Sequence, residues 1–505
     1  MKYGKVFNCE GKNMKKRIGV ILLCILLIVS SLVIFFPVEA VKLSGNTFYV
    51  GGSGPGNYTK IQDAINDSSN GDTVLVYRGV YYENIVVNKT INLIGEDRTK
   101  TVIDGGTEGC VITLKKIDGI KTSGFTIHNG KTGIYLLDSS NNNITGNNIQ
   151  NNTNYGIYFN YFSNNNNIIN DNIIQNNKIC IYMDSNNCNN IISNNIFKNN
   201  IQAIYFYYSS NNIIIGNDIQ CGIWILNEIT RGIYLWGSTN DIIKDNNIHN
   251  ISYMGIKPSI GISLEGSNIT IIGNNIQDNS MSGISSSGSD IIITCNNIQN
   301  NGEGLLIASS KHFIISDNNI QNNRKGIRII SSEHNIPDFI ISGNNIQNNT
   351  EYGIYLNCPS VTNYNPYVNY TITGNIIKIN NVGVFVYQTP GWKKGISNNI
   401  ISNNNIGIEL KDSSLHDIIS NNISNNEYGV YIHSLSNSNE IKNNNFINNQ
   451  LKDAYFENSF FNIWNNNYWD QWNKIGPKKI SGKFIQIIPL INFDWHPARE
   501  PYDIT

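Results

Sequence analysis

The chain has 505 residues and a formal charge of −1 at pH 7, because 36 Lys and Arg side chains are balanced by 37 Asp and Glu side chains. A basic tract occurs only at the N-terminus. This composition argues against a nucleic-acid-binding protein and fits a large secreted protein.

The first 40 residues have the pattern of an export signal. Basic residues between Lys12 and Arg17 precede an uncharged apolar run from Ile18 to Phe36, and Val38-Glu39-Ala40 follows. This pattern predicts a signal peptide that is cleaved after Ala40. The apolar run is also long enough to span a bilayer, so an uncleaved N-terminal membrane anchor is the alternative. In both cases we expect the rest of the chain to be extracellular, secreted or held at the cell surface, with the membrane contacted only through this segment.

Residues 124–449 repeat one short phrase with a base period of 22–24 residues. Each copy contains an Asn pair, an apolar anchor residue, more Asn, and Gly-Ile-Tyr or a close variant. A repeat of this length cannot bury its own apolar residues, so successive copies must stack and share one core. The anchors are Ile149, Ile173, Ile196, Ile219, Ile248, Ile276, Ile298, Ile320, Ile346, Ile376, Ile400, Ile423 and Phe446.

Each copy alternates apolar and polar residues over two or three short segments that are separated by polar turns. This predicts an all-β fold, a right-handed parallel β-helix solenoid in which each copy forms one coil. The Asn runs 141–143, 164–167 and 403–405 are predicted to form turns. Asn tolerates left-handed backbone angles there, and its amide can bond to the same amide of the next coil.

Segments on both sides of the repeats carry a family resemblance. Tyr58-Thr59-Lys60-Ile61-Gln62-Asp63-Ala64-Ile65 and Gly71-Asp72-Thr73-Val74-Leu75-Val76 precede the repeats, and Asn466-Asn467-Tyr468-Trp469-Asp470 and Asp494-Trp495-His496-Pro497-Ala498 follow them. With these residues the chain resembles NosD-type β-helix proteins of the pectin-lyase-like superfamily, which share a carbohydrate-binding and sugar-hydrolase domain and are often labelled periplasmic copper-binding.

The resemblance implies three extracellular regions. Residues 41–123 would form an N-terminal cap with a short helix and the first coils, residues 124–449 the parallel β-helix repeats, and residues 450–505 a C-terminal capping segment. The fold leaves the activity open, because one β-helix hosts binding proteins, lyases, hydrolases and epimerases.

One face of the predicted coils is rich in aromatic residues. The residue after the Gly-Ile isoleucine points outward, because side chains alternate along a strand. Outward rings and acids suit a polysaccharide or cell-wall glycan, whereas stacked tyrosines can equally serve only to stabilise neighbouring strands. The outward positions hold Tyr135, Tyr158, Tyr182, Tyr205 and Tyr234, and two residues further along Asp184, Tyr207, Trp236 and Glu265; later copies hold Tyr355, Phe385, Tyr387, Glu409, Tyr431 and His433.

Longer copies place insertions beside this face. Because insertions in adjacent coils lie side by side, they are predicted to build two walls. The first wall contains Trp224, Glu228, Arg231, Tyr253 and Lys257, and the second contains Glu333, His334, Asp338, Tyr364, Tyr367 and Tyr370. We expect a ligand site beside the first wall, with Trp224 and Lys257 joining the aromatic face.

The catalytic candidates are Glu228, Arg231 and Glu265. A glycoside hydrolase needs two carboxylates across one bond, which Glu228 and Glu265 would supply. A polysaccharide lyase or epimerase could use Arg231 or Lys257 as a base, but no cluster of Asp residues accompanies them to hold calcium. We therefore favour a monomeric, non-catalytic surface protein that binds polysaccharide; a carbohydrate-active enzyme and a purely structural surface protein are the alternatives.

Metal chemistry has little support in the sequence. The seven His residues are spread along the chain, and the five Met residues form no cluster. His416 and His433 could approach one another across one coil. No cofactor or metal site is predicted, and a NosD-like copper-handling protein is a further alternative.

Overall fold

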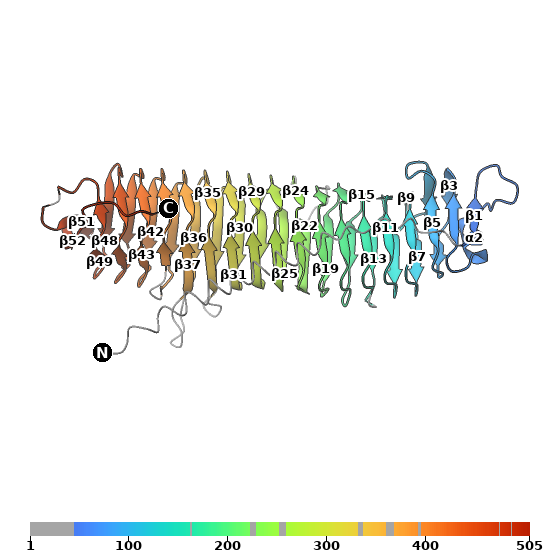
Figure 1. Ribbon diagram of the computed structural model, residues 1–505, viewed down its shortest axis with the longest axis horizontal. Helices are drawn as coiled ribbons and strands as arrows, with labels where there is room; N and C mark the ends of the chain where they lie inside the picture. Colours follow the sequence, from blue (N-terminus) through green and yellow to red (C-terminus); the bar gives the residue numbers. More distant parts are fainter. Residues whose placement is uncertain are drawn as a thin grey trace. The chain divides into compact units, whose positions relative to one another are not determined.

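The computed structural model describes residues 45–161, 164–222, 229–251, 259–331, 337–359, 368–391, 395–473, 475–485 and 487–504. The predicted signal peptide or anchor lies outside this range. The unit Gly45–Thr505 is a parallel β-helix, which confirms the predicted fold class (Figure 1). Within the described part, no helix has the length and apolar character needed to cross a membrane.

The strands form three columns, and successive coils pair in parallel within each column. The first column contains β4 (Ile85–Val87), β7 (Cys110–Lys115), β10 (Thr132–Leu137), β13 (Tyr155–Phe159), β16 (Ile179–Met183), β19 (Gln202–Tyr207), β22 (Thr230–Thr239), β25 (Ser259–Ile272), β27 (Ser282–Ser286), β30 (Glu303–Ala308), β33 (Lys325–Ile330), β36 (Tyr352–Asn357), β39 (Val382–Tyr387), β42 (Ile406–Lys411), β45 (Tyr428–His433), β48 (Lys452–Glu457) and β51 (Lys478–Phe484).

The second column contains β1 (Thr47–Val50), β2 (Thr73–Val76), β5 (Asn92–Gly95), β8 (Lys121–Ser123), β11 (Asn143–Thr145), β14 (Ile168–Asn170), β17 (Ile191–Ser193), β20 (Ile213–Ile215), β23 (Ile242–Lys244), the end of β25, β28 (Ser289–Thr294), β31 (Lys311–Ser316), β34 (Asp338–Ser342), β37 (Asn369–Thr373), β40 (Gly395–Ser397), β43 (Asp417–Ile419), β46 (Glu440–Lys442), β49 (Ile463–Asn465) and β52 (Ile488–Asp494).

The third column contains β3 (Gly79–Tyr82), β6 (Thr101–Asp104), β9 (Thr126–His128), β12 (Asn148–Gln150), β15 (Ile173–Gln175), β18 (Ile196–Lys198), β21 (Asp218–Ile219), β24 (Asn247–His249), β26 (Asn275–Gln277), β29 (Asn297–Gln299), β32 (Asn319–Gln321), β35 (Asn345–Gln347), β38 (Ile376–Lys378), β41 (Ile400–Ser402), β44 (Asn422–Ser424), β47 (Asn445–Ile447) and β50 (Tyr468–Trp469).

The register corrects four of the predicted anchors. Ile149 pairs with Ile174, not with Ile173, and the residues aligned with it in later coils are buried. Both positions are apolar in these copies, so the alternation does not distinguish them, and a slip of one residue exchanges the two faces of a strand. The predicted anchors Ile173, Ile196, Ile376 and Ile400 therefore lie on the outer side, and Ile174, Phe197, Ile377 and Ile401 are the core residues.

Asn ladders line the inner side of the turns, as the Asn runs predicted. In the longest ladder, the backbone N–H and Nδ2 of Asn296 donate to Oδ1 of Asn318 over 2.9 and 3.0 Å, and Nδ2 also donates to the Ile271 carbonyl over 3.0 Å. These bonds satisfy polar groups that would otherwise be costly to bury. The ladder consists of Asn147, Asn172, Asn195, Asn217, Asn246, Asn274, Asn296, Asn318, Asn344, Asn375, Asn399, Asn421, Asn444 and Asn467, all almost fully buried.

A ladder needs only an acceptor at its last position, and two ladders end on an aspartate. Asp494 accepts from the Asn467 backbone N–H over 2.9 Å and from Trp469 Nε1 over 3.1 Å. Asp241 ends another ladder by accepting from the Asn212 N–H over 2.8 Å. Its neighbour in the next coil is the buried Ile269, so burial raises the pKa of Asp241 to about 7.

Both ends of the described stack are closed. At the N-terminal end, α2 (Ile61–Asp67) buries Ile61, Ala64 and Ile65, and the Glu83 carboxylate accepts from two N–H groups in its first turn, including that of Ile61 over 2.8 Å. At the C-terminal end, β48, β49 and β50 form a further coil after residue 449. Then β51 and β52 pair with each other in antiparallel orientation.

A candidate glycan-binding face

The outer face of the first column carries a ladder of tyrosine rings, here called the Tyr ladder. Parallel pairing places each ring directly beside its counterpart in the next coil. The ring centroids of successive members are separated by 5.2, 5.4, 5.1 and 4.8 Å. Its members are Tyr135, Tyr158, Tyr182, Tyr205 and Tyr234, as the sequence predicted.

The packing decides what the Tyr ladder can offer a ligand. Tyr155 adds another ring, at 4.9 Å from Tyr158 and 5.2 Å from Tyr182. The inner rings are therefore partly covered by other rings, through stacked or tilted contacts and, between Tyr182 and Tyr205, an edge-to-face contact, and they remain only half-exposed. Burial raises the pKa of both Tyr158 and Tyr205 to about 12, because it disfavours the ionised form.

The Tyr ladder ends in a polar cluster around Tyr234. The Tyr234 hydroxyl donates to Glu265 Oε1 over 2.8 Å, and the Arg231 guanidinium lies 4.2 Å from the ring centroid. These neighbours leave Tyr234 only 8% exposed. Trp236, two residues further along β22, is 40% exposed and contacts Tyr207 edge-on at 5.3 Å. The Trp236 ring also stacks on the Tyr234 ring at 6.4 Å, yet Trp236 is the most exposed aromatic residue among the described members of this cluster.

Part of the predicted site falls outside the described residues. Trp224, Glu228, Tyr253 and Lys257 of the first wall lie there, as do Glu333, His334, Tyr364 and Tyr367 of the second. The structure therefore does not test the Glu228 and Glu265 pair. Among the described candidates, the strands bring Arg231, Glu265, Tyr207, Tyr234 and Trp236 together, and Asp184 lies beside Tyr158 at 3.5 Å.

The aromatic row is interrupted in the middle of the face. The coils after β22 place Ser263, Ser285 and Leu306 at the Tyr position. Next to them Glu303 is almost fully buried and takes ion pairs from Arg328 at 2.9 Å and Lys325 at 3.4 Å. These charges compensate one another, which indicates a structural role for this stretch.

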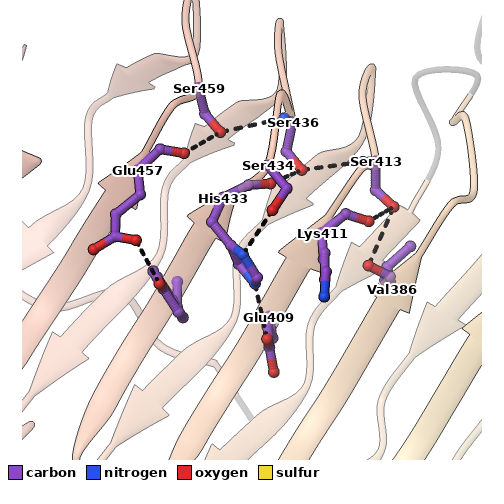
Figure 2. Close-up of polar contacts among 10 residues, drawn as sticks. Val386, Glu409, Lys411, Ser413, His433, Ser434, Ser436, Glu457 and Ser459 are labelled. Carbon is purple, nitrogen blue, oxygen red and sulfur yellow. Dashed lines mark hydrogen bonds and ion pairs between the residues drawn. The ribbon is translucent and has the colours of Figure 1, made fainter. Parts of the chain in front are cut away.

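A second group of aromatic and charged residues follows near the C-terminal end (Figure 2). His433 Nε2 lies 2.9 Å from Glu409 Oε1, and the Tyr431 hydroxyl donates to Glu457 Oε2 over 3.1 Å. The His433 ring stacks on the Tyr431 ring at 4.5 Å. The sequence placed Glu409, Tyr431 and His433 on this face but predicted no site there.

Beside this group lies a hollow of about 570 Å³, here called the C-terminal hollow. This volume is within the range of ordinary ligand pockets, about 300–1,000 Å³. The hairpin of β51 and β52 borders it, so residues of the last coil and of the cap meet there. The side chains that line it include those of Tyr428, Tyr431, Tyr455, Lys452, Glu457 and Lys483.

Among the described residues, no group of three or more His, Cys, Asp or Glu side chains is arranged to hold a metal ion. His416 is buried, and its Nδ1 and Nε2 lie 2.8 Å from the Tyr370 hydroxyl and 2.6 Å from the Thr389 carbonyl. Tyr370, which was expected in the second wall, is thus a core residue. Burial lowers the pKa of His416 to about 4. His416 and His433, whose approach the sequence left open, lie on different sides of the coil wall, because His416 is buried in the core and His433 contacts Glu409 on the outer face.

The family follows from comparison with known sequences. A family model described as periplasmic copper-binding protein (NosD) matches residues 65–257 and 360–486, which together exceed half of the chain. The chain belongs to the NosD family. A second model, described as right handed beta helix region, matches residues 231–391 of this NosD-family protein, in agreement with the predicted handedness. The described residues nevertheless do not fit the copper ion that the family description implies.

Individual relatives match less of the NosD-family chain. A cell surface glycoprotein of Methanothermus fervidus is 39% identical over 97 residues, which cover 19% of this chain and 16% of that protein. The A-module of the mannuronan C-5 epimerase AlgE4 of Azotobacter vinelandii is 17% identical with a TM-score of 0.48, over 67% of this chain and 97% of that one. The catalytic domain of a GH87 α-1,3-glucanase is 12% identical with a TM-score of 0.38, over 67% and 65%. Likeness of this degree says nothing about activity.

Proposed function

We propose that this NosD-family chain is a cell-surface protein that binds a polysaccharide along the outer face of its first-column strands. The observation that carries the proposal is the row of register-aligned tyrosines that ends at the exposed Trp236. Aromatic rings contribute large contact areas, and hydroxyl and carboxylate groups beside them can bond to sugar hydroxyls.

The surface location is supported by three separate features. The N-terminal apolar run has the pattern of an export signal or an anchor. The family description names a periplasmic protein, and the Methanothermus fervidus relative is named a cell surface glycoprotein.

The packing of the Tyr ladder refines how a polysaccharide would be held. The inner rings are only half-exposed, so the ladder would form hydrogen bonds and edge contacts along the chain of sugars. A sugar ring can stack face-on at Trp236, which is open to solvent. Asp184 and Glu265 would accept hydrogen bonds from sugar hydroxyls, although Glu265 already accepts one from Tyr234.

A polysaccharide array with the full chain tests the proposal, with reducing-end and unsaturated-product assays on each polymer that binds. We expect binding without product, and we expect Trp236→Ala to weaken it about tenfold or more, because a stacked aromatic contact is lost. Tyr82→Ala is the matched control, since Tyr82 is 79% exposed on a third-column strand, away from this face. Equal loss in both variants, or no binding to any polymer, would overturn the proposal; product formation would establish the enzyme alternative.

A further inference from the structure

The C-terminal hollow differs from the Tyr ladder in the way its ring column ends. The first-column register aligns Tyr431 with Tyr455, and Tyr455 with Ser481 of β51. Ser481 is small and is followed by Gly482, and among the described residues the Tyr455 ring contacts only the rings of Tyr428 and Tyr431. The Tyr431 and Tyr455 rings are also 5.8 Å apart and tilted by 33°. One face of Tyr455 is therefore open to the hollow.

Two lysines give the hollow a positive charge. Lys452 and Lys483 are both exposed and line it from β48 and from β51. Neither has an ion pair or a side-chain hydrogen bond with the residues that the structure describes. Other lysines nearby are compensated: Lys478 Nζ lies 3.6 Å from Asp453, and Lys442 Nζ lies 2.9 Å from Glu440. The two free ammonium groups are thus left to meet an anion from outside.

Glu457 adds an acceptor with a fixed position. Its Oε2 accepts from the Tyr431 hydroxyl over 3.1 Å, and this bond holds the carboxylate at the edge of the hollow. A carboxylate has about four lone-pair sites, so Glu457 keeps the capacity to accept a further bond from a ligand hydroxyl. An aromatic face, two cations and one acceptor are what an acidic sugar unit requires, since the unit has an apolar ring face, an anionic group and hydroxyl groups.

We infer that the C-terminal hollow is a subsite for an acidic sugar unit. The Tyr455 ring supports the sugar ring, Lys452 and Lys483 pair with its carboxylate or sulfate group, and Glu457 accepts a sugar hydroxyl. This inference rests on the proposed polysaccharide binding and specifies the chemical class of the polymer as anionic.

Titration calorimetry with the full chain tests the inference. The probes are an oligogalacturonate, which carries carboxylates, a dextran sulfate of similar length, which carries sulfate esters, and unmodified dextran, which is neutral. We expect at least one anionic probe to bind about fivefold or more tightly than dextran, and the preferred probe identifies the anionic group. Raising the salt concentration should reduce this preference, because exposed ion pairs are screened.

Substitutions of the lining residues test whether the preference for anionic probes arises in the hollow. Lys452→Gln combined with Lys483→Gln should weaken binding of the preferred anionic probe by about 5–10-fold and leave dextran unchanged. Lys479→Gln is the matched control, because Lys479 is an exposed lysine of the same strand that does not line the hollow. Tyr455→Ala should weaken binding, and Tyr455→Phe should retain it.

The outcomes separate this inference from the proposed function. If Trp236→Ala abolishes binding while the double lysine variant binds both anionic probes as the unchanged protein does, the polysaccharide proposal stands and the acidic subsite is refuted. A loss of equal size in Lys479→Gln also refutes the subsite. If no polysaccharide binds, both proposals fall.

Discussion

The Tyr ladder and the C-terminal hollow both lie on the outer face of the first column, but the residues aligned with their tyrosines in the next coil differ. In the Tyr ladder, Tyr follows Tyr through five coils, and neighbouring rings are 4.8–5.4 Å apart. In the hollow, Tyr431 is followed by Tyr455 and then by Ser481, while Glu457 beside them is followed by Lys483. An aromatic residue on a β-helix face is thus a packing element or an open contact surface according to the residue one coil away.

The largest expected difference between the two regions concerns stability. Tyr182→Ala removes a ring that contacts Tyr155, Tyr158 and Tyr205, so we expect the free energy of unfolding to fall by about 2–4 kcal/mol. Tyr455→Ala removes a ring with one open face, and we expect a loss of about 1 kcal/mol or less. Chemical denaturation of both variants measures the difference, and equal losses would contradict the distinction between packed and open rings.

The two regions also differ in how their Asn ladders end. The pKa of Asp241 is about 7 in the folded state, whereas the pKa of an unfolded Asp is near 3.8. Between these values the folded state binds more protons, so its stability falls as the pH rises from about 4 to about 7. Asp241→Asn removes this dependence. We expect the variant to exceed the unchanged protein by about 1–4 kcal/mol at pH 8 and to match it near pH 4, as measured by denaturation across this range.

Asp494→Asn is the control for this prediction, and its effect should have the opposite sign. Asp494 accepts hydrogen bonds from Asn466, Asn467 and Trp469. An amide there gives up a charge-assisted acceptor, so we expect a loss of about 1–3 kcal/mol at neutral pH. If Asp241→Asn destabilises as Asp494→Asn does, the assignment of Asp241 as a strained ladder end is wrong.

The smallest expected difference concerns two hydroxyl groups. Tyr431→Phe and Tyr234→Phe each remove a hydrogen bond to a carboxylate, on Glu457 and Glu265 respectively. We expect each to lower the free energy of unfolding by about 0.5–1 kcal/mol. Tyr431→Phe should lower the preference for an anionic probe over dextran by about twofold, because it releases a carboxylate beside the two lysines, whereas Tyr234→Phe should leave this preference unchanged. A similar loss of the preference in Tyr234→Phe would show that the hollow has no special part in anion binding.

Much of the fold follows from the repeat, whereas the register is fixed by packing. The phrase Gly-Ile-Tyr and its close variants predicted the Tyr ladder because the isoleucine of each copy points inward and the residue after it, which is Tyr in the five coils of the ladder, points outward. Ile173 and Ile376 were misplaced because Ile-Ile pairs satisfy either face, and only the pairing of Ile149 with Ile174 decides between them. The polarity pattern alone does not contain that information.

The C-terminal hollow was missed for a different reason. Asp453-Ala454-Tyr455-Phe456-Glu457 repeats the outward pattern of the earlier coils, with Ala454 in place of the usual isoleucine, and this was a signal that could have been used. Lys483, however, lies on β51, which continues the first column parallel to β48 but follows the last copy of the repeat and lacks its sequence phrase. Its neighbours depend on tertiary contacts rather than on the period.

The long Asn ladder has a consequence for how such chains can change in length. Each inner Asn donates to the next coil and accepts from the previous one, so the inner members are interchangeable. Excision of residues 296–317 would remove one complete copy with its ladder residue, Asn296. Asn274 would then donate to Asn318 in place of Asn296, with the same donor and acceptor groups.

Loss or gain of a whole copy therefore leaves no broken bond inside the turn. A copy that lies between the Tyr ladder and the C-terminal hollow, such as residues 296–317, would bring these two surfaces closer together when it is lost and move them apart when it is duplicated. Each such change shifts them by one strand spacing, about 4.8 Å. The number of copies therefore sets the distance between two contact points for a long polymer, in steps of one strand spacing.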